Sequence, residues 1–252
     1  MGSSDIESVL KLARRVEKTA VGAFERERFL PDTRADLLLI TMAVRCLALF
    51  RGVIRCADDA LADPAMVIAR SLLELRFVVL AVARSADDAE RTKRLSSIAA
   101  QAEHDRARAL KKLKSLPTSD RSEQVTDELL SLAEAGLDVE RRSTSAEQWA
   151  RWAGLHGMYL TAYTSLSLHA HPSYLALDAM VTRSASDELS ISAKPHQDRL
   201  AITVVSATEA MVDALAALPE GYVSREDIAA IALHREAVVR EWQGIPEQDL
   251  SF

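Results

Sequence analysis

The most apolar helical pattern in the chain runs from Ala65 to Ala83. Asp63 and Pro64 stand just before it, and these residue types favour the N-cap and the first position of a helix. Because the run is apolar nearly all the way round, it predicts a helix over residues 64–84 that other helices enclose. Three charged side chains interrupt the run: Arg70, Glu74 and Arg76.

Amphipathic patterns fill most of the remaining chain and predict further helices around the central one. Ser, Thr and β-branched residues alternate near 178–194, which indicates a short hairpin or an irregular excursion. We therefore expect an all-α fold: one domain over residues 1–252, a bundle of seven to eight helices whose last helix and tail cover 220–252. Thr33, Ser145 and Ser224 are the expected N-caps of three of these helices. The other predicted helices span residues 4–29, 33–57, 85–116, 120–142, 145–169, 195–218 and 224–243.

Net charge, cysteine content and the length of the apolar runs indicate which partners and which cellular compartment to expect. The net charge of −6 gives no general attraction to nucleic acid or to anionic membranes. Cys46 and Cys56 fall on one predicted helix about 15 Å apart, too far for a disulfide, and two free thiols fit a reducing cytoplasm. The apolar run 37–50 is short and contains Arg45, so we expect no membrane span and a cytoplasmic protein.

Charge is unevenly distributed over the predicted helices 85–116 and 120–142. Residues 91–114 contain eight Lys or Arg and two acids, whereas residues 123–147 contain seven acids and two Arg. Mutual neutralisation of these two neighbouring helices is the simpler interpretation, and a phosphate-binding face on the basic helix is the alternative.

Polar side chains that could form a site occur on two helices. Arg70 and Glu74 are four residues apart and project from one face of the central helix, where an enclosed charge needs a partner. On the predicted helix 145–169, helical spacing aligns a polar and aromatic seam that His171 would extend. These side chains either bury their rings at the edge of the core or line a ligand site. The seam consists of Trp152, His156, Tyr159, Tyr163 and Ser167.

The two histidines near the end of that helix do not predict a metal site. His169 and His171 are two positions apart, so on a continuous helix they would point about 200° apart. No Glu-x-x-His pair and no cysteine cluster accompanies them to complete a set of four ligands. We therefore expect neither a metal nor another cofactor.

Arg151 and His156 match the Arg-x4-His spacing of HEPN-type ribonucleases. This resemblance implies that the histidine and arginine would handle the ribose hydroxyl and the phosphate of RNA, usually across a dimer. Residue 152 is Trp where that family usually has a small polar residue. The sequence has no Gly-x-Ser-x-Gly turn and no Gly-rich phosphate loop, so neither a serine hydrolase nor a nucleotide-binding loop is predicted.

Two motifs together resemble a bacterial helical family of unknown function, DUF5677. They are the segment from Arg70 to Glu74 and the segment from Tyr163 to His171, and the resemblance covers about residues 35–215. It implies an α-helical bundle in which Arg70, Glu74 and a histidine from 169–171 meet, and it implies no known activity.

The leading functional hypothesis is a non-enzymatic bacterial module that binds a protein partner or a small polar ligand. Its polar centre would consist of Arg70, Glu74, Tyr163, Ser167 and either His169 or His171. The rival hypothesis is a metal-independent ribonuclease or other hydrolase that uses Arg151 and His156 at a cleft or in the groove of a homodimer; RNA is a partner only in that case.

Overall fold

The computed structural model describes residues 3–26, 33–114, 144–170, 180–183, 189–191, 197–218 and 223–243. Within these residues the fold is a helical bundle with one two-stranded hairpin, which confirms the expected all-α class. The first four helices are α1 (Ser3–Arg26), α2 (Arg34–Asp58), α3 (Ala62–Ala83) and α4 (Asp88–Lys114). The predicted helix 120–142 and the tail beyond Gln243 lie outside the described residues.

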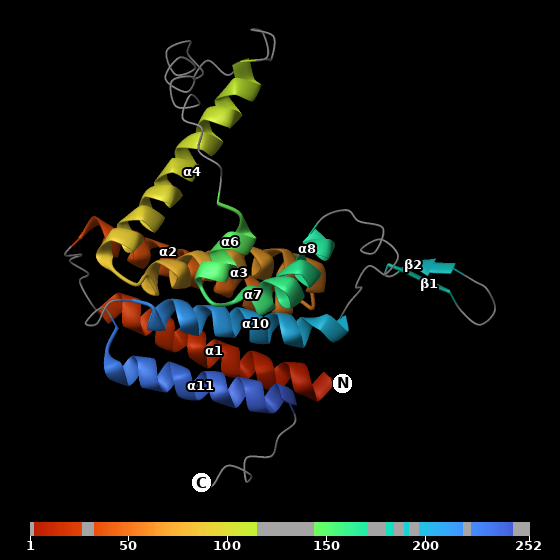
Figure 1. Cartoon of the computed structure of the whole chain (residues 1–252). Coiled ribbons are helices and arrows are strands. Elements are labelled where there is room, and N and C mark those ends of the chain that lie inside the picture. The colour runs from red at the N-terminus through yellow and green to blue at the C-terminus, as the bar shows by residue number, and fades with distance from the viewer. Residues whose placement is uncertain are drawn as a thin grey trace.

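Helix α3 occupies the centre of the bundle, as its apolar sequence predicts. It packs against α2 and α10 (Gln197–Ala216) along its length, and α6 (Ala146–Trp152) and α8 (Thr164–Ala170) cover a third side (Figure 1). Leu72, Leu73 and Phe77 are fully buried there. On the other side of α10, α1 pairs with α11 (Arg225–Gln243) and closes the bundle.

Short polar caps begin several helices where the sequence predicts them. The hydroxyl oxygen of Thr33 accepts a hydrogen bond from the backbone N–H of Asp36 at 3.1 Å. Ser145 caps α6 (Ala146–Trp152) in the same way, and Ser224 caps α11. Each cap satisfies one of the donors that a helix leaves unpaired in its first turn.

The predicted cap at Asp63 is wrong, because α3 begins two residues earlier. The backbone N–H of Leu61 bonds to the carbonyl of Cys56 at 2.8 Å, and Ala60 adopts a left-handed conformation with φ of 56°. This tight turn ends α2 and leads directly into α3, so Asp63 and Pro64 fall inside the first turn. Asp63 there still interacts favourably with the positive end of the helix dipole.

The segment predicted as one helix over 145–169 is broken after α6. Gly154 has a φ of 69°, and the N–H of Leu155 reaches back to the carbonyl of Ala150 at 2.8 Å. Arg84, the residue just after α3, donates a hydrogen bond to the carbonyl of Ala153 and so connects this turn to the end of α3. The chain then continues as α7 (His156–Met158), a π-helical turn η2 (Tyr159–Tyr163) and α8 (Thr164–Ala170).

The predicted hairpin is present in the described part of 178–194. Strand β1 (Val181–Arg183) pairs antiparallel with β2 (Leu189–Ile191), with Val181 opposite Ile191. The hairpin lies to one side of the bundle in Figure 1.

One described helix is long and apolar enough to cross a membrane by length and composition, namely Ala35–Asp58 in α2. Its apolar stretch is longer than the run 37–50 that the sequence singles out. Half of its most apolar window is buried in the bundle, where it packs against α1, α3 and α10. The helix thus forms part of the core. Cys46 and Cys56 on it are both free thiols, as predicted.

The enclosed charge on α3 is Arg76, rather than the predicted pair of Arg70 and Glu74. The Arg76 side chain is 2% exposed, and its Nε donates to Asp213 Oδ2 on α10 at 2.9 Å while Nη2 donates to the same oxygen. Glu209 lies 3.8 Å from Arg76, and Arg235 of α11 lies 3.6 Å from the other oxygen of Asp213. This cluster joins α3, α10 and α11. In contrast, the side chain of Glu74 is 45% exposed.

We predict that Asp213→Ala destabilises the protein by about 3 kcal/mol, because it leaves the buried guanidinium of Arg76 without its nearest carboxylate. The matched control is Glu74→Ala, which removes the acid of the other arginine pair on the same helix. Because that pair is partly exposed, we expect the control to change stability by less than about 1 kcal/mol. Urea unfolding of both variants measures the difference, and equal destabilisation would show that the two pairs are equally enclosed.

Candidate functional site

Four of the residues that the sequence singles out meet where α3 faces η2 and α8. Arg70 Nε donates to Ser167 Oγ at 3.0 Å, and Arg70 Nη2 donates to the Tyr163 hydroxyl at 2.9 Å. The Tyr163 hydroxyl in turn donates to Glu74 Oε2 at 3.4 Å. The ion pair between Arg70 Nη1 and Glu74 Oε2 is long, at 3.9 Å. These four residues are called the Arg70 centre below.

The π-helical turn η2 places Tyr163 in this centre. Its wider turn is supported by Thr164, whose hydroxyl donates to the carbonyl of Tyr159 at 2.8 Å. One turn later the Ser167 hydroxyl donates to the carbonyl of Tyr163 at 2.8 Å, so its lone pairs remain to accept from Arg70. Single π-helical turns occur frequently at functional sites, because they re-aim the side chains of an otherwise regular helix.

Aromatic rings form the floor of the Arg70 centre. The guanidinium carbon of Arg70 lies 5.1 Å from the centroid of the Tyr163 ring. That ring stacks on Tyr159 with centroids 5.1 Å apart, and Tyr159 stacks on His156 at 6.3 Å. Phe77 of α3 contacts Tyr163 from the core side at 5.8 Å. The seam from His156 to Ser167 is therefore continuous.

Burial raises the pKa of the Tyr163 phenol above its usual value, and the nearby Glu74 carboxylate raises it further. The phenol therefore remains protonated at neutral pH and serves as a donor to Glu74 and as an acceptor for Arg70. The Tyr163 hydroxyl thus links the Arg70 guanidinium to the Glu74 carboxylate through one hydrogen bond to each.

The Arg70 centre lies on the partly exposed face of α3, which corrects the expectation of an enclosed pair. The side chains of Arg70 and Glu74 are 27% and 45% exposed. A helix that is apolar nearly all round does not show which of its faces its neighbours leave uncovered, so the sequence could not place Arg70 on the partly exposed face and Arg76 on the buried one. His171 and the side chain of His169 lie outside the described residues.

Trp152 does not belong to the seam. The helix break at Gly154 turns it away, and it packs edge-on against Trp149 with centroids 5.0 Å apart. Arg94 of α4 lies over the Trp152 ring at 5.4 Å. Trp152 therefore contributes to the packing of α6.

Arg151 and His156 share one carboxylate, that of Glu147. Arg151 Nη2 lies 2.7 Å and His156 Nε2 lies 3.1 Å from Glu147 Oε1, and all three side chains are partly exposed. The hydrogen bond from Arg151, reinforced by His156, lowers the pKa of Glu147. Sequence reasoning missed Glu147, although its spacing of four residues from Arg151 on α6 was a usable signal.

Within the part of the chain that the structure describes, no three His, Cys, Asp or Glu side chains lie close enough to share a metal ion. The groups that do converge are a guanidinium, a carboxylate, a phenol and a hydroxyl in the Arg70 centre. Such groups recognise small polar molecules through charge and hydrogen bonds.

Comparison with known proteins gives a family and no activity. Neither the curated proteins nor the solved structures include a significant match to this chain. The model of a family of unknown function, DUF5677, matches residues 36–189, a stretch that includes most of α2, all of α3 and α4, and every residue of the Arg70 centre. The match covers more than half of the chain, so this protein belongs to the family of unknown function DUF5677.

Proposed function

We propose that this protein is a non-enzymatic helical module that binds a small polar ligand at the Arg70 centre. The observation that carries this proposal is the incomplete pairing of Arg70. Two of its three nitrogens donate to neutral oxygens of Ser167 and Tyr163, and its nearest carboxylate oxygen is 3.9 Å away. A partly buried guanidinium attracts an anionic group more strongly than a fully hydrated one does.

The chemistry of the centre also suggests what else the ligand carries. Glu74 is partly exposed, and its contacts with Tyr163 and Arg70 are long, at 3.4 and 3.9 Å. An anion alone would be repelled by this carboxylate. A ligand with a phosphate or carboxylate next to an ammonium or hydroxyl donor would satisfy Arg70 and Glu74 together.

We predict that phosphoethanolamine or β-alanine binds the purified protein at least ten-fold more tightly than methyl phosphate, acetate or ethanolamine alone. Each of the first two probes carries an anion and an ammonium, one with a phosphate and one with a carboxylate. Titration calorimetry compares all five, and the tighter of the two zwitterions identifies the anion. Equal and very weak binding of all five probes would refute the proposal.

Variants assign the binding to particular side chains. Arg70→Gln should weaken binding of the zwitterion at least ten-fold, and Glu74→Gln should remove its advantage over the anion alone. The matched control is Arg151→Gln, which removes an exposed arginine outside the centre and should leave the affinity unchanged. If Arg151→Gln weakens binding as much as Arg70→Gln does, the loss reflects the change in net charge of the protein, and the Arg70 centre is not the binding site.

A second candidate function is RNA cleavage by Arg151 and His156. The observation in its favour is that both side chains are partly exposed and converge on Glu147 at 2.7 and 3.1 Å. A general base must come within about 3 Å of the hydroxyl that it deprotonates, and this exposure would permit such an approach. Against it, Glu147 already engages both groups and presents a negative charge to an approaching phosphate.

We predict that mixed RNA stays intact after incubation with the protein in the absence of metal ions. Arg151→Ala and His156→Ala, each with a thermal melt, complete the experiment. If the parent cleaves RNA and both variants lose this activity with unchanged melting temperatures, the protein is a ribonuclease and the proposal of a non-enzymatic binding module is wrong.

A further inference from the structure

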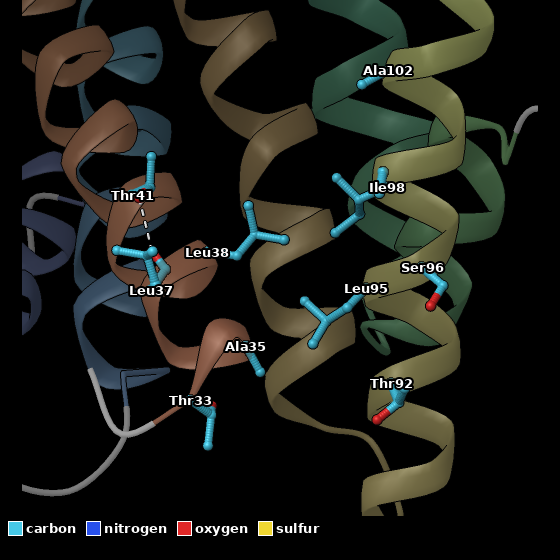
Figure 2. A pocket seen from close by; sticks show the side chains of 11 residues that line it. Thr33, Ala35, Leu37, Leu38, Thr41, Thr92, Leu95, Ser96, Ile98 and Ala102 are labelled. Carbon is cyan, nitrogen blue, oxygen red and sulfur yellow. Dashed lines mark hydrogen bonds between the residues drawn. The ribbon is translucent and has the colours of Figure 1, made fainter. Parts of the chain in front are cut away.

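A second feature, separate from the Arg70 centre, is a groove between α2 and α4 with a volume of about 740 Å³. Figure 2 shows Leu38 of α2 and Leu95 and Ile98 of α4 pointing into the space between the two helices. Alanines and one further leucine add to these walls, and none of the residues that line the groove is charged or aromatic. The body of a molecule that fills this groove is therefore apolar.

The dimensions of the groove favour a small molecule over a protein partner. Residues 33–41 of α2 and 92–102 of α4 line it, which correspond to about 12 and 15 Å of helix. Two walls of this length, each about 10 Å wide, offer less than half of the roughly 800 Å² that a stable protein interface covers on each partner. The volume of about 740 Å³ instead falls within the range of small-molecule sites. An elongated small ligand is therefore the occupant that fits.

The two ends of the groove differ in polarity. In Figure 2 Thr33 and Thr92 lie at one end, and Thr41 and Ala102 lie at the other. The Thr41 hydroxyl donates to the carbonyl of Leu37 at 2.8 Å, so its hydrogen is already engaged within α2. At the first end the hydroxyl of Thr92 can donate to an oxygen atom of a ligand. This arrangement suits a molecule with a polar head at the Thr92 end and an apolar tail.

The charges beside the Thr92 end favour an anionic head. Arg91 pairs with Asp36 at 2.8 Å, and the Thr33 hydroxyl donates to the other carboxylate oxygen at 2.7 Å. Both oxygens of Asp36 are thus engaged, and its side chain is 10% exposed, against 29% for Arg91. The Nε–H of Arg91 has no hydrogen-bond partner within the part of the chain that the structure describes. Residues 91–114 also contain eight Lys or Arg and two acids. A carboxylate is therefore attracted to this end, and an ammonium group is repelled.

We propose that the α2–α4 groove binds a medium-chain fatty acid. The carboxylate lies near Thr92 and Arg91, and the unbranched tail lies between Leu38 and Ile98. Each methylene that enters the groove removes apolar surface of both molecules from water. The site shares no residue with the Arg70 centre, so it is a second binding site of this protein.

A series of fatty acids from hexanoate to tetradecanoate, each below its micelle concentration, tests the tail by titration calorimetry. Each added methylene should tighten binding about two- to four-fold while it enters the groove, because a groove that is open on one side covers only part of the tail. The gain should end once the tail outgrows the roughly 15 Å of the groove. Affinity that does not depend on chain length, or no binding of any of the acids, would overturn the proposal.

Decanoate and decylamine test the head, because they carry similar tails and opposite charges. Decanoate should bind several-fold more tightly, although the net charge of the whole protein is −6 and favours the amine. Equal or tighter binding of decylamine would contradict an anionic head at the Thr92 end.

Variants locate the site. Ala99→Trp places a large ring in the groove and should weaken decanoate binding at least ten-fold. Ala99 is exposed, so the melting temperature should stay close to that of the parent. The matched control is Ala229→Trp, at an exposed alanine of α11, and it should bind decanoate like the parent. Arg70→Gln should also leave decanoate binding unchanged, because it alters only the other site.

Decanoate binding that survives Ala99→Trp would place the fatty acid elsewhere, and its loss in Arg70→Gln would place it at the Arg70 centre. If no acid binds and the parent sediments as a dimer that Ala99→Trp dissociates, the groove is a protein interface and the proposal is wrong. Binding of phosphoethanolamine and β-alanine at the Arg70 centre is measured separately, so this proposal and the proposed function can fail independently.

Discussion

The buried ion pair between Arg76 and Asp213 is the interaction on which the arrangement of the helices depends. A guanidinium that is 2% exposed must be paired, so α3 and α10 pack in the register that brings Asp213 to Arg76. Arg235 then orients α11 toward the same aspartate, and the Sδ of Met158 accepts from Arg76 Nη1 at 2.9 Å from the side of α7. The pair thus fixes the position of the segment that continues into η2 and the Arg70 centre.

Helix α3 carries two arginines with different surroundings. Arg76 is buried, and acids on α10 surround it. Arg70, nearly two turns earlier, is partly exposed, its hydrogen-bond partners are neutral, and its nearest carboxylate is 3.9 Å away. The charge of Arg76 is neutralised by carboxylates within the fold, whereas the charge of Arg70 is only partly neutralised and can attract a ligand. This contrast on one helix is the physical basis of the proposed binding function.

Local sequence signals predicted much of the fold and less of the site. Polar caps such as Thr33 and Ser145 act within one helical turn, so the local sequence predicts them. The spacing of four residues likewise predicts that Arg70 and Glu74 share one face of α3. Asp213 is 137 residues from Arg76, and no local pattern connects them. The break at Gly154 was hidden because the apolar pattern continues across it, and only a glycine with φ of 69° marks the turn. The exposure of Arg70 and Glu74 depends on which face of α3 the neighbouring helices leave uncovered, which is a property of the assembled bundle.

The central claim is that Arg70 is the arginine that receives a ligand, while Arg76 serves the fold. NMR spectra that resolve the Nε–H signals of individual arginines test it most directly, because they report the surroundings of each guanidinium separately. During a titration with phosphoethanolamine or β-alanine, the account predicts a saturable shift of the Arg70 signal with at least one of the two probes and an unchanged Arg76 signal. An Arg70 signal that stays fixed with both probes, or Arg70 and Arg76 signals that move together, would contradict it.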